Sequence, residues 1–125
     1  MNKQFWIKII AVSGFLSVAL GAFAAHGLES VLSDRRMDTF QTAAQYQIFH
    51  TLALLGIICT EDGLLQVRCK IYLARCFVLG IILFSGSLYL LAITDISALG
   101  MLAPIGGSAF IIGWAMLFIE AIRSK

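Results

Sequence analysis

Two polar side chains, Gln47 and His50, lie in the segment from Asp38 to Cys59, which is apolar enough to lie in lipid only from Ile48 on. A polar group that faces hydrocarbon costs several kcal/mol unless it is paired, so the helix that carries them must be surrounded by other helices. An ionisable side chain inside a membrane is a candidate site by default. We therefore predict a polar centre at Gln47 and His50, either lining a pocket or a proton path, or only holding the helices together.

Serines of the neighbouring apolar segments come close to the depth of this centre. A helix rises about 1.5 Å per residue, which brings Ser13 and Ser17, Ser85 and Ser108 to within a turn or two of His50. The predicted ligand-binding set is therefore Gln47, His50, Ser17, Ser85 and Ser108. The alternative is that these hydroxyls bond the carbonyls of their own helices, as Ser and Thr often do.

A second polar group is expected at the outer surface, where His26, Arg36 and Asp95 follow or precede apolar segments. We predict that they form an outer mouth, the alternative being that His26 is a plain interfacial residue. His26 and His50 differ in depth on the order of 10 Å, from the rise of a helix, so they cannot be the two axial ligands of one haem. No metal site and no cofactor are predicted.

Motifs of known enzyme classes are absent from the sequence. It contains no GxSxG, HExxH, Walker A or GxGxxG pattern, and its carboxylates all lie near the ends of apolar segments. No catalytic residue is predicted, and an enzyme is the less favoured class. A membrane enzyme that acts on lipid with His50 or His26 as its base stays a third possibility.

The composition is that of an integral membrane protein. Of 125 residues, 60% are hydrophobic and 13% charged, and the mean hydropathy is +0.93, whereas soluble domains are about half apolar and a quarter charged. One transmembrane domain is predicted, residues 1–125, of the all-α class. Its helices are expected at about 5–25, 38–60, 71–93 and 99–122. Because the connections are short, these should form an up-down four-helix bundle.

The positive charges predict the orientation. Lys3, Lys8, Arg68, Lys70, Arg75, Arg123 and Lys125 flank one side of the predicted spans, and Arg35 and Arg36 the other. The positive-inside rule then places both termini in the cytoplasm, N-in and C-in. Cys59, Cys69 and Cys76 fall on the same side. A net charge of +2 is too small to indicate nucleic-acid binding.

Small residues mark the first and last spans. Gly14 and Gly21 lie one heptad apart, and Gly106, Gly107 and Gly113 lie in the fourth span. Small residues let helix backbones approach closely in a membrane, so these five are predicted to pack helices. The packing of helices within one short bundle requires fewer small residues than these five. We therefore expect a homo-oligomer, with an unidentified membrane-protein partner as the other possibility.

Four stretches together resemble the YgdD-like family of small inner-membrane proteins, a family of unknown function that includes a human transmembrane protein. They are GAFAAHGL (21–28), YQIFHTLA (46–53), LFSGSLY (83–89) and PIGG (104–107) with Gly113 and Trp114. The resemblance implies a four-helix bacterial inner-membrane protein of unassigned biochemistry. Ala24 stands where the family usually has Gly, and Ala103 where it usually has Thr, which removes a hydroxyl from the start of the last helix.

Two classes of function follow from these observations. One is a membrane protein that binds or conducts a small molecule, lipid or ion at the polar centre. The other is a structural or accessory protein that packs against a partner in the bilayer and has no ligand. An enclosed polar centre favours the first, and unused small-residue faces favour the second.

Overall fold

The computed structural model describes residues 1–61 and 63–123, so Lys125, counted above among the cytoplasmic cations, lies outside the described residues. The described residues form helices and turns and no strand. The helical elements are α1 (Lys3–Phe23) with η1 (Ala24–Leu28), α2 (Asp34–Cys59), α3 (Val67–Gly80) with η2 (Ile81–Ser85) and α4 (Gly86–Thr94), and η3 (Ser97–Met101) with α5 (Ala103–Arg123). Four helical segments, 3–28, 34–59, 67–94 and 97–123, are long and apolar enough to cross a membrane.

Each segment is longer than the sequence pattern suggests. α2 begins at Asp34 instead of near residue 38, and α3 begins at Val67 instead of near residue 71. Hydropathy marks only residues that tolerate hydrocarbon, whereas a helix can extend through the headgroup region into water. The polar first turn of α2, which carries Arg35 and Arg36, is such an extension.

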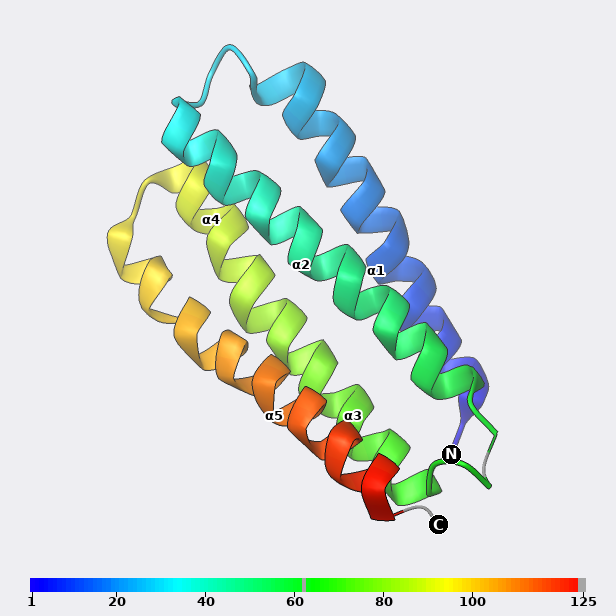
Figure 1. Ribbon diagram of the computed structural model, residues 1–125. Coiled ribbons are helices and arrows are strands. Elements are labelled where there is room, and N and C mark those ends of the chain that lie inside the picture. Colours follow the sequence, from blue (N-terminus) through cyan, green and yellow to red (C-terminus); the bar gives the residue numbers. More distant parts are fainter. Residues whose placement is uncertain (62, 124–125) are drawn as a thin grey trace.

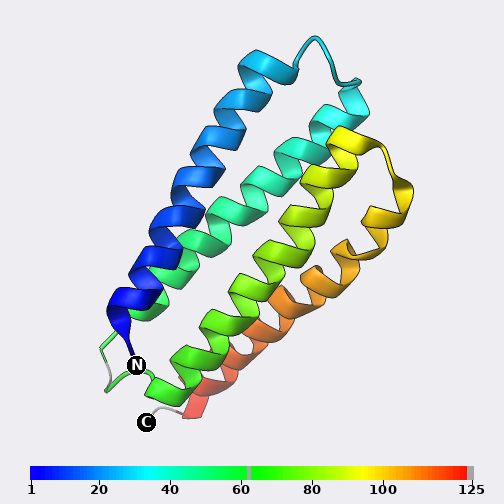
Figure 2. The same cartoon turned by 180° about the vertical axis from the view of Figure 1, so that it is seen from behind.

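The four segments lie side by side, and the two chain ends lie at the same end of the molecule (Figures 1 and 2). We call this the terminal end. In both views α2 lies between α1 and the α3–α4 segment. α1 packs mainly on α2, and α5 packs mainly on α3 and η2. α1 is therefore the least enclosed of the four segments.

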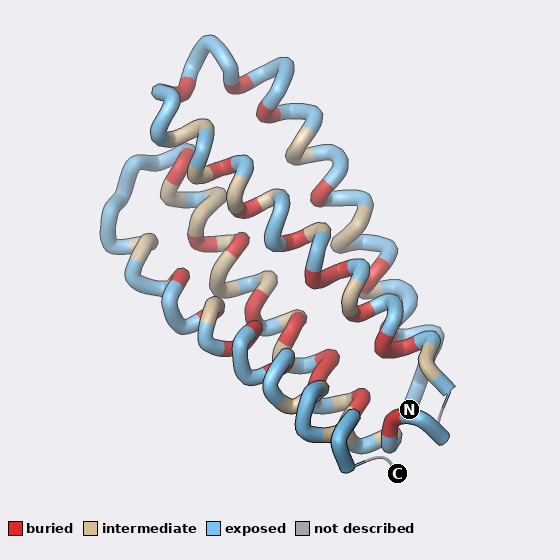
Figure 3. The backbone as a smooth tube through the Cα atoms, in the orientation of Figure 1, coloured by how far each residue is buried: buried red, intermediate tan, exposed pale blue. Residues whose placement is uncertain are grey.

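The buried residues concentrate where α2 meets its neighbours (Figure 3). Of the apolar window in each segment, 39% is buried in α2 and 17% in α1. The glutamine-bearing segment is thus the most enclosed, as polar side chains in a bilayer require. Gln41 and Gln45, however, are exposed.

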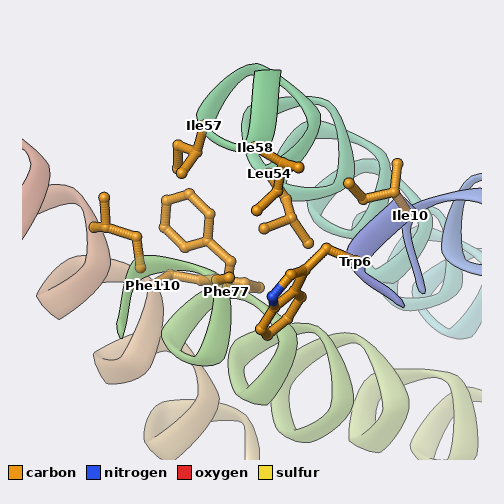
Figure 4. Close-up of a cluster of buried hydrophobic side chains, with 9 residues drawn as sticks. Trp6, Ile10, Leu54, Ile57, Ile58, Phe77 and Phe110 are labelled. Carbon is orange, nitrogen blue, oxygen red and sulfur yellow. The ribbon is translucent and has the colours of Figure 1, made fainter. Parts of the chain in front are cut away.

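Two hydrophobic clusters form the core. The larger, nearer the terminal end, joins all four segments (Figure 4) and contains Trp6, Ile10, Leu54, Ile57, Ile58, Leu73, Ala74, Phe77 and Phe110. The smaller lies at the other end and contains Ala24, Leu28, Leu32, Phe40 and Ala92. Inside a membrane the hydrophobic effect does not drive helices together, because lipid tails are as apolar as these side chains. Tight van der Waals packing of the two clusters stabilises the bundle instead.

The glycines of α5 allow a close approach within one chain. A Cβ on Gly106 would lie 2.3 Å from the backbone nitrogen of Phe84, and one on Gly113 would lie 2.5 Å from the ring of Phe77. Gly107 and Gly14 have ordinary contact distances in front of them, and Gly21 has no atom within 4 Å. Gly106 and Gly113 therefore serve the contact of α5 with α3 and η2.

Candidate functional site

Gln47 joins three of the four segments through its side-chain amide. Its Nε2 donates to the backbone oxygen of Ser13 at 3.0 Å and lies 3.4 Å from the Ser13 hydroxyl. Its Oε1 accepts a hydrogen bond from the hydroxyl of Tyr89 at 2.7 Å. α2 is thereby tied to α1 and to α4, and the side chain is only 4% exposed.

Thr51 completes this group one turn along α2. Its hydroxyl donates to the backbone oxygen of Gln47 at 2.7 Å, so its oxygen accepts the proton of Ser13, which lies 2.7 Å away. We call Ser13, Gln47, Thr51 and Tyr89 the Gln47 cluster. Both ends of the Gln47 amide and all three hydroxyls have partners inside the protein, as buried polar groups require.

His50 points to a different set of neighbours. Its Nδ1 lies 2.8 Å from the backbone oxygen of Tyr46, which can only accept, and its Nε2 lies 3.1 Å from the indole nitrogen of Trp114, which can only donate. These partners fix the neutral tautomer that carries its proton on Nδ1. The ring stacks on Phe110 at a centroid distance of 3.5 Å and meets the edge of Phe77.

The three predicted serines do not gather around Gln47. Ser17 donates to the backbone oxygen of Gly14 at 2.8 Å, and the exposed Ser108 donates to that of Pro104 at 2.8 Å. The hydroxyl of Ser85 is buried in η2 without a hydrogen-bond partner among the described residues. The structure thus joins Gln47 to Ser13, a turn before the predicted Ser17.

At the end opposite the termini, Arg36 and Asp95 line one pocket of about 360 Å³, together with Arg35. Arg36 donates to the backbone oxygens of Ala92 at 2.6 Å and Ile93 at 2.5 Å, and the Arg35 guanidinium lies 3.4 Å from Asp95. His26 is exposed and does not line this pocket. Two of the three residues expected at the outer mouth are therefore together.

A groove of about 410 Å³ opens between α1 and the α3–η2 segment, and we call it the α1–α3 groove. Gln47 of α2 lines it with Ser13, and Lys8 is the one charged residue in its wall. All its other lining side chains are apolar: Phe5, Ile9, Val12, Leu16, Val78, Ile81 and Ile82. Two of them, Ile81 and Ile82, belong to η2, a wider π-helical turn of a kind frequent at functional sites.

The sequence interpretation missed the two aromatic donors, Tyr89 and Trp114. Tyr89 lies four residues after Ser85, and Trp114 four residues after Phe110, so each shares a helix face with a residue that packs inside. Those spacings were the available signal. Among the residues that the structure describes, no three His, Cys, Asp or Glu side chains lie close enough to hold a metal ion.

Comparison with known proteins places the chain among small membrane proteins of unknown function. Residues 20–107 match the family described as "Protein of unknown function (DUF423)". The chain is 42% identical to the UPF0382 inner membrane protein YgdD of Escherichia coli K12, over 100% of this chain and 95% of that protein. It is 41% identical to the UPF0382 membrane protein YwdK of Bacillus subtilis, over 94% and 96% respectively. No solved structure matches the chain.

Proposed function

The chain belongs to the DUF423 family, described as proteins of unknown function, and we propose that it binds an acyl chain of a membrane lipid in the α1–α3 groove. The observation that carries this proposal is the groove itself, about 410 Å³, open between α1 and α3 and walled by apolar side chains. That volume lies within the range of small-molecule sites.

The hydrogen bonds of Gln47 and Ser13, the two uncharged polar residues that line the groove, favour an apolar ligand. Both ends of the Gln47 amide are already bonded, to Ser13 and to Tyr89, and Ser13 also bonds Thr51. A polar ligand would have to break these bonds, whereas a hydrocarbon chain leaves them intact. The groove therefore suits a hydrocarbon chain, which forms no hydrogen bond with Gln47 or Ser13.

The contacts of His50 favour binding over conduction. A proton carrier at this position needs a nitrogen that can exchange its proton with water or with a titratable neighbour. Nδ1 bonds the Tyr46 carbonyl, and Nε2 bonds the Trp114 indole, which cannot accept a proton. A proton added at Nε2 would point at the N–H of Trp114.

Native mass spectrometry after mild delipidation tests this proposal. Ile82 lines the groove and is 61% exposed, so Ile82→Trp fills the groove without removing a core contact. Ile112 on α5 is 53% exposed and lies outside the groove, so Ile112→Trp is the matched control. We expect the wild type and Ile112→Trp to retain bound phospholipid and Ile82→Trp to lose it.

Two results would overturn the acyl-chain proposal. In the first, the wild type retains no phospholipid under conditions in which the four-helix fold persists, as judged by circular dichroism. In the second, Ile82→Trp and Ile112→Trp retain equal amounts, which would mean that the lipid adheres to the whole apolar surface instead of the groove.

We also propose an up-down arrangement across the bacterial inner membrane with both termini in the cytoplasm. The support is the placement of the cations and the printed name of the E. coli relative, an inner membrane protein. Ser30 is exposed and belongs to the connection between η1 and α2, which lies at the end opposite the termini (Figure 1). A membrane-impermeant maleimide should label Ser30→Cys in intact spheroplasts, but the cysteines of the wild type only after lysis. Labelling of the wild type in intact spheroplasts would contradict this orientation.

A homo-oligomer, or an accessory role beside another membrane protein, is the second candidate. It is favoured by Gly21, which has open space in front of it on α1, the least enclosed segment. Native mass spectrometry also measures the number of protein chains in each complex. We expect an oligomer that Gly21→Leu dissociates; a wild type that is monomeric in nanodiscs would contradict the oligomer.

A further inference from the structure

The α1–α3 groove carries a positive charge at one end only. Lys8 lies in its wall on α1, a turn and a half after the helix begins at Lys3, and is exposed. The groove then continues along α1 through Val12 to Leu16 without another charge. Its charged end is therefore the terminal end of the molecule.

A second cation stands on the facing helix. Arg75 precedes Val78 by three residues on α3, so it neighbours a residue that lines the groove, although it is not itself a lining residue. Arg75 is exposed. Lys8 and Arg75 thus come from the two helices that form the walls, and both lie on the terminal side of most of the apolar lining.

An exposed aromatic residue indicates that this end lies at the membrane surface. Tyr72, which is 55% exposed, lies three residues before Arg75. Trp and Tyr are enriched where the hydrocarbon meets the headgroups. Lys8 and Arg75 are therefore at or near headgroup depth, within reach of a phosphate because long cationic side chains extend toward the surface.

Neither cation is committed to the protein itself. Among the described residues the one ion pair is that of Arg35 with Asp95, at the other end of the molecule, and no hydrogen bond or ion pair involves the side chain of Lys8 or of Arg75. Lys70, by contrast, is fully buried and donates to the backbone oxygen of Thr60. Two uncommitted cations beside an apolar groove match the charge and shape of an anionic phospholipid.

We propose that the α1–α3 groove selects a phospholipid with a net negative headgroup, whose phosphate is held by Lys8 and Arg75 while one acyl chain lies along the groove. This inference rests on the acyl-chain function proposed above and adds the headgroup chemistry. The site takes its ligand from the bilayer. A free phosphate would leave the apolar groove without an occupant.

The test is a competition between two lipids with identical acyl chains. The protein is placed in nanodiscs that contain equal amounts of phosphatidylglycerol and phosphatidylcholine, and the lipid that stays bound after release is identified by native mass spectrometry. We expect phosphatidylglycerol to be enriched in the wild type. A basic residue near anionic lipid is worth about 1 kcal/mol, so Lys8→Gln and Arg75→Gln should each lower the enrichment about fivefold.

Matched variants separate the headgroup site from general charge. Arg123 lies in the last turn of α5 at the same end of the molecule, and its helix contributes no residue to the groove. Arg123→Gln should keep the enrichment of the wild type. Lys8→Arg should also keep it, which checks that a change at position 8 is tolerated by the fold. High ionic strength should weaken the enrichment in the wild type, since salt screens exposed charges.

The outcomes distinguish the two proposals. Lipid retained by the wild type without enrichment, or an equal fall of enrichment in Arg123→Gln, would overturn the headgroup inference while the acyl-chain function stands. No retained lipid would overturn both. A second copy of the chain in place of lipid, seen as a dimer that Ile82→Trp dissociates, would assign the groove to a protein contact and would also overturn both.

Discussion

The indole nitrogen of Trp114 donates a hydrogen bond to Nε2 of His50 at 3.1 Å, joining α5 to α2. The imidazole also stacks on Phe110, so it is held by aromatic rings as well as by its two hydrogen bonds. Trp114 is 47% exposed and His50 is 6% exposed, so the indole lies at the surface of the bundle and covers the imidazole. Both ring nitrogens of His50 are therefore engaged by groups of the protein itself.

Trp114→Phe should destabilise the protein by leaving Nε2 of His50 buried without a donor. A buried polar atom that loses its partner costs about 1–3 kcal/mol. Thermal unfolding in a mild detergent measures the change. Phe118→Leu, one turn along α5 at a side chain that is 67% exposed, is the control and should shift the midpoint little.

The double variant His50→Phe with Trp114→Phe checks the cause of that effect. Replacing both partners of a hydrogen bond with apolar groups removes the unsatisfied atom and can be nearly neutral. The double variant should therefore be more stable than Trp114→Phe alone. Equal or lower stability would show that the indole contributes by packing and not by donating to His50.

Tyr89→Phe should show how far the Gln47 cluster depends on the hydroxyl that donates to Oε1 of Gln47. The change removes a hydroxyl and leaves Oε1 of Gln47, which is 4% exposed in the intact protein, without its 2.7 Å bond. We expect a loss of about 1–3 kcal/mol in the free energy of unfolding. Tyr72→Phe, at a ring that is 55% exposed, is the matched control. If both changes lower the unfolding midpoint equally, the hydrogen bond to Gln47 contributes nothing measurable.

Much of the fold followed from the chain because lipid imposes strict rules. The length of apolar runs predicted four spans, and the cost of an amide in hydrocarbon predicted that Gln47 would be enclosed. The same reasoning did not identify its partners. Helix rise gives depth to within about one turn of roughly 5.4 Å, and the four residues from Ser13 to Ser17 span only about 6 Å, so the two serines could not be told apart.

The sequence pattern did not predict how each helix is rotated about its own axis. Ser108 is exposed, because Gly106 faces Phe84 and fixes which side of α5 turns inward. Trp114 was unexpected as a partner of His50 because tryptophan in a membrane span is usually assigned to the interface. Close approach of backbones, which decides rotation, depends on side-chain shape more than on hydropathy.

Gly106→Ala should force α5 away from η2. The new Cβ would lie 2.3 Å from the backbone nitrogen of Phe84 and 2.8 Å from the carbonyl carbon of Leu83, and a backbone atom cannot turn aside as a side chain can. Overpacking of this kind costs about 1–3 kcal/mol. The unfolding midpoint in detergent measures it.

The adjacent glycine provides the control for that change. A Cβ on Gly107 would meet its nearest atom, in the ring of Phe84, at an ordinary 3.7 Å. Gly107→Ala should therefore be neutral, or stabilising by up to about 1 kcal/mol through helix propensity. A Gly106→Ala protein as stable as Gly107→Ala would show that the approach of α5 to η2 is looser than described.

Arg36→Gln should loosen the end of α4, although Arg36 itself belongs to the first turn of α2. The last carbonyls of a helix have no partner within it and carry the negative end of its dipole. The Arg36 guanidinium supplies two donors there, to Ala92 and Ile93, and so fastens the start of α2 to the end of α4. Since hydrogen bonds to a charged group contribute about 1.5–3 kcal/mol and Arg36 is only partly buried, we expect a loss near the lower end of that range.

Arg35→Gln is the matched change, one residue earlier on the same helix. Arg35 forms its ion pair with Asp95 at 3.4 Å between side chains that are 82% and 56% exposed, and such surface pairs contribute about 0–1 kcal/mol. Amide hydrogen exchange of residues 92–96 measures both variants locally. Exchange should accelerate more in Arg36→Gln than in Arg35→Gln, because only the former removes partners of helix carbonyls. The reverse order would mean that the ion pair with Asp95, and not the carbonyl contacts, holds this end of α4.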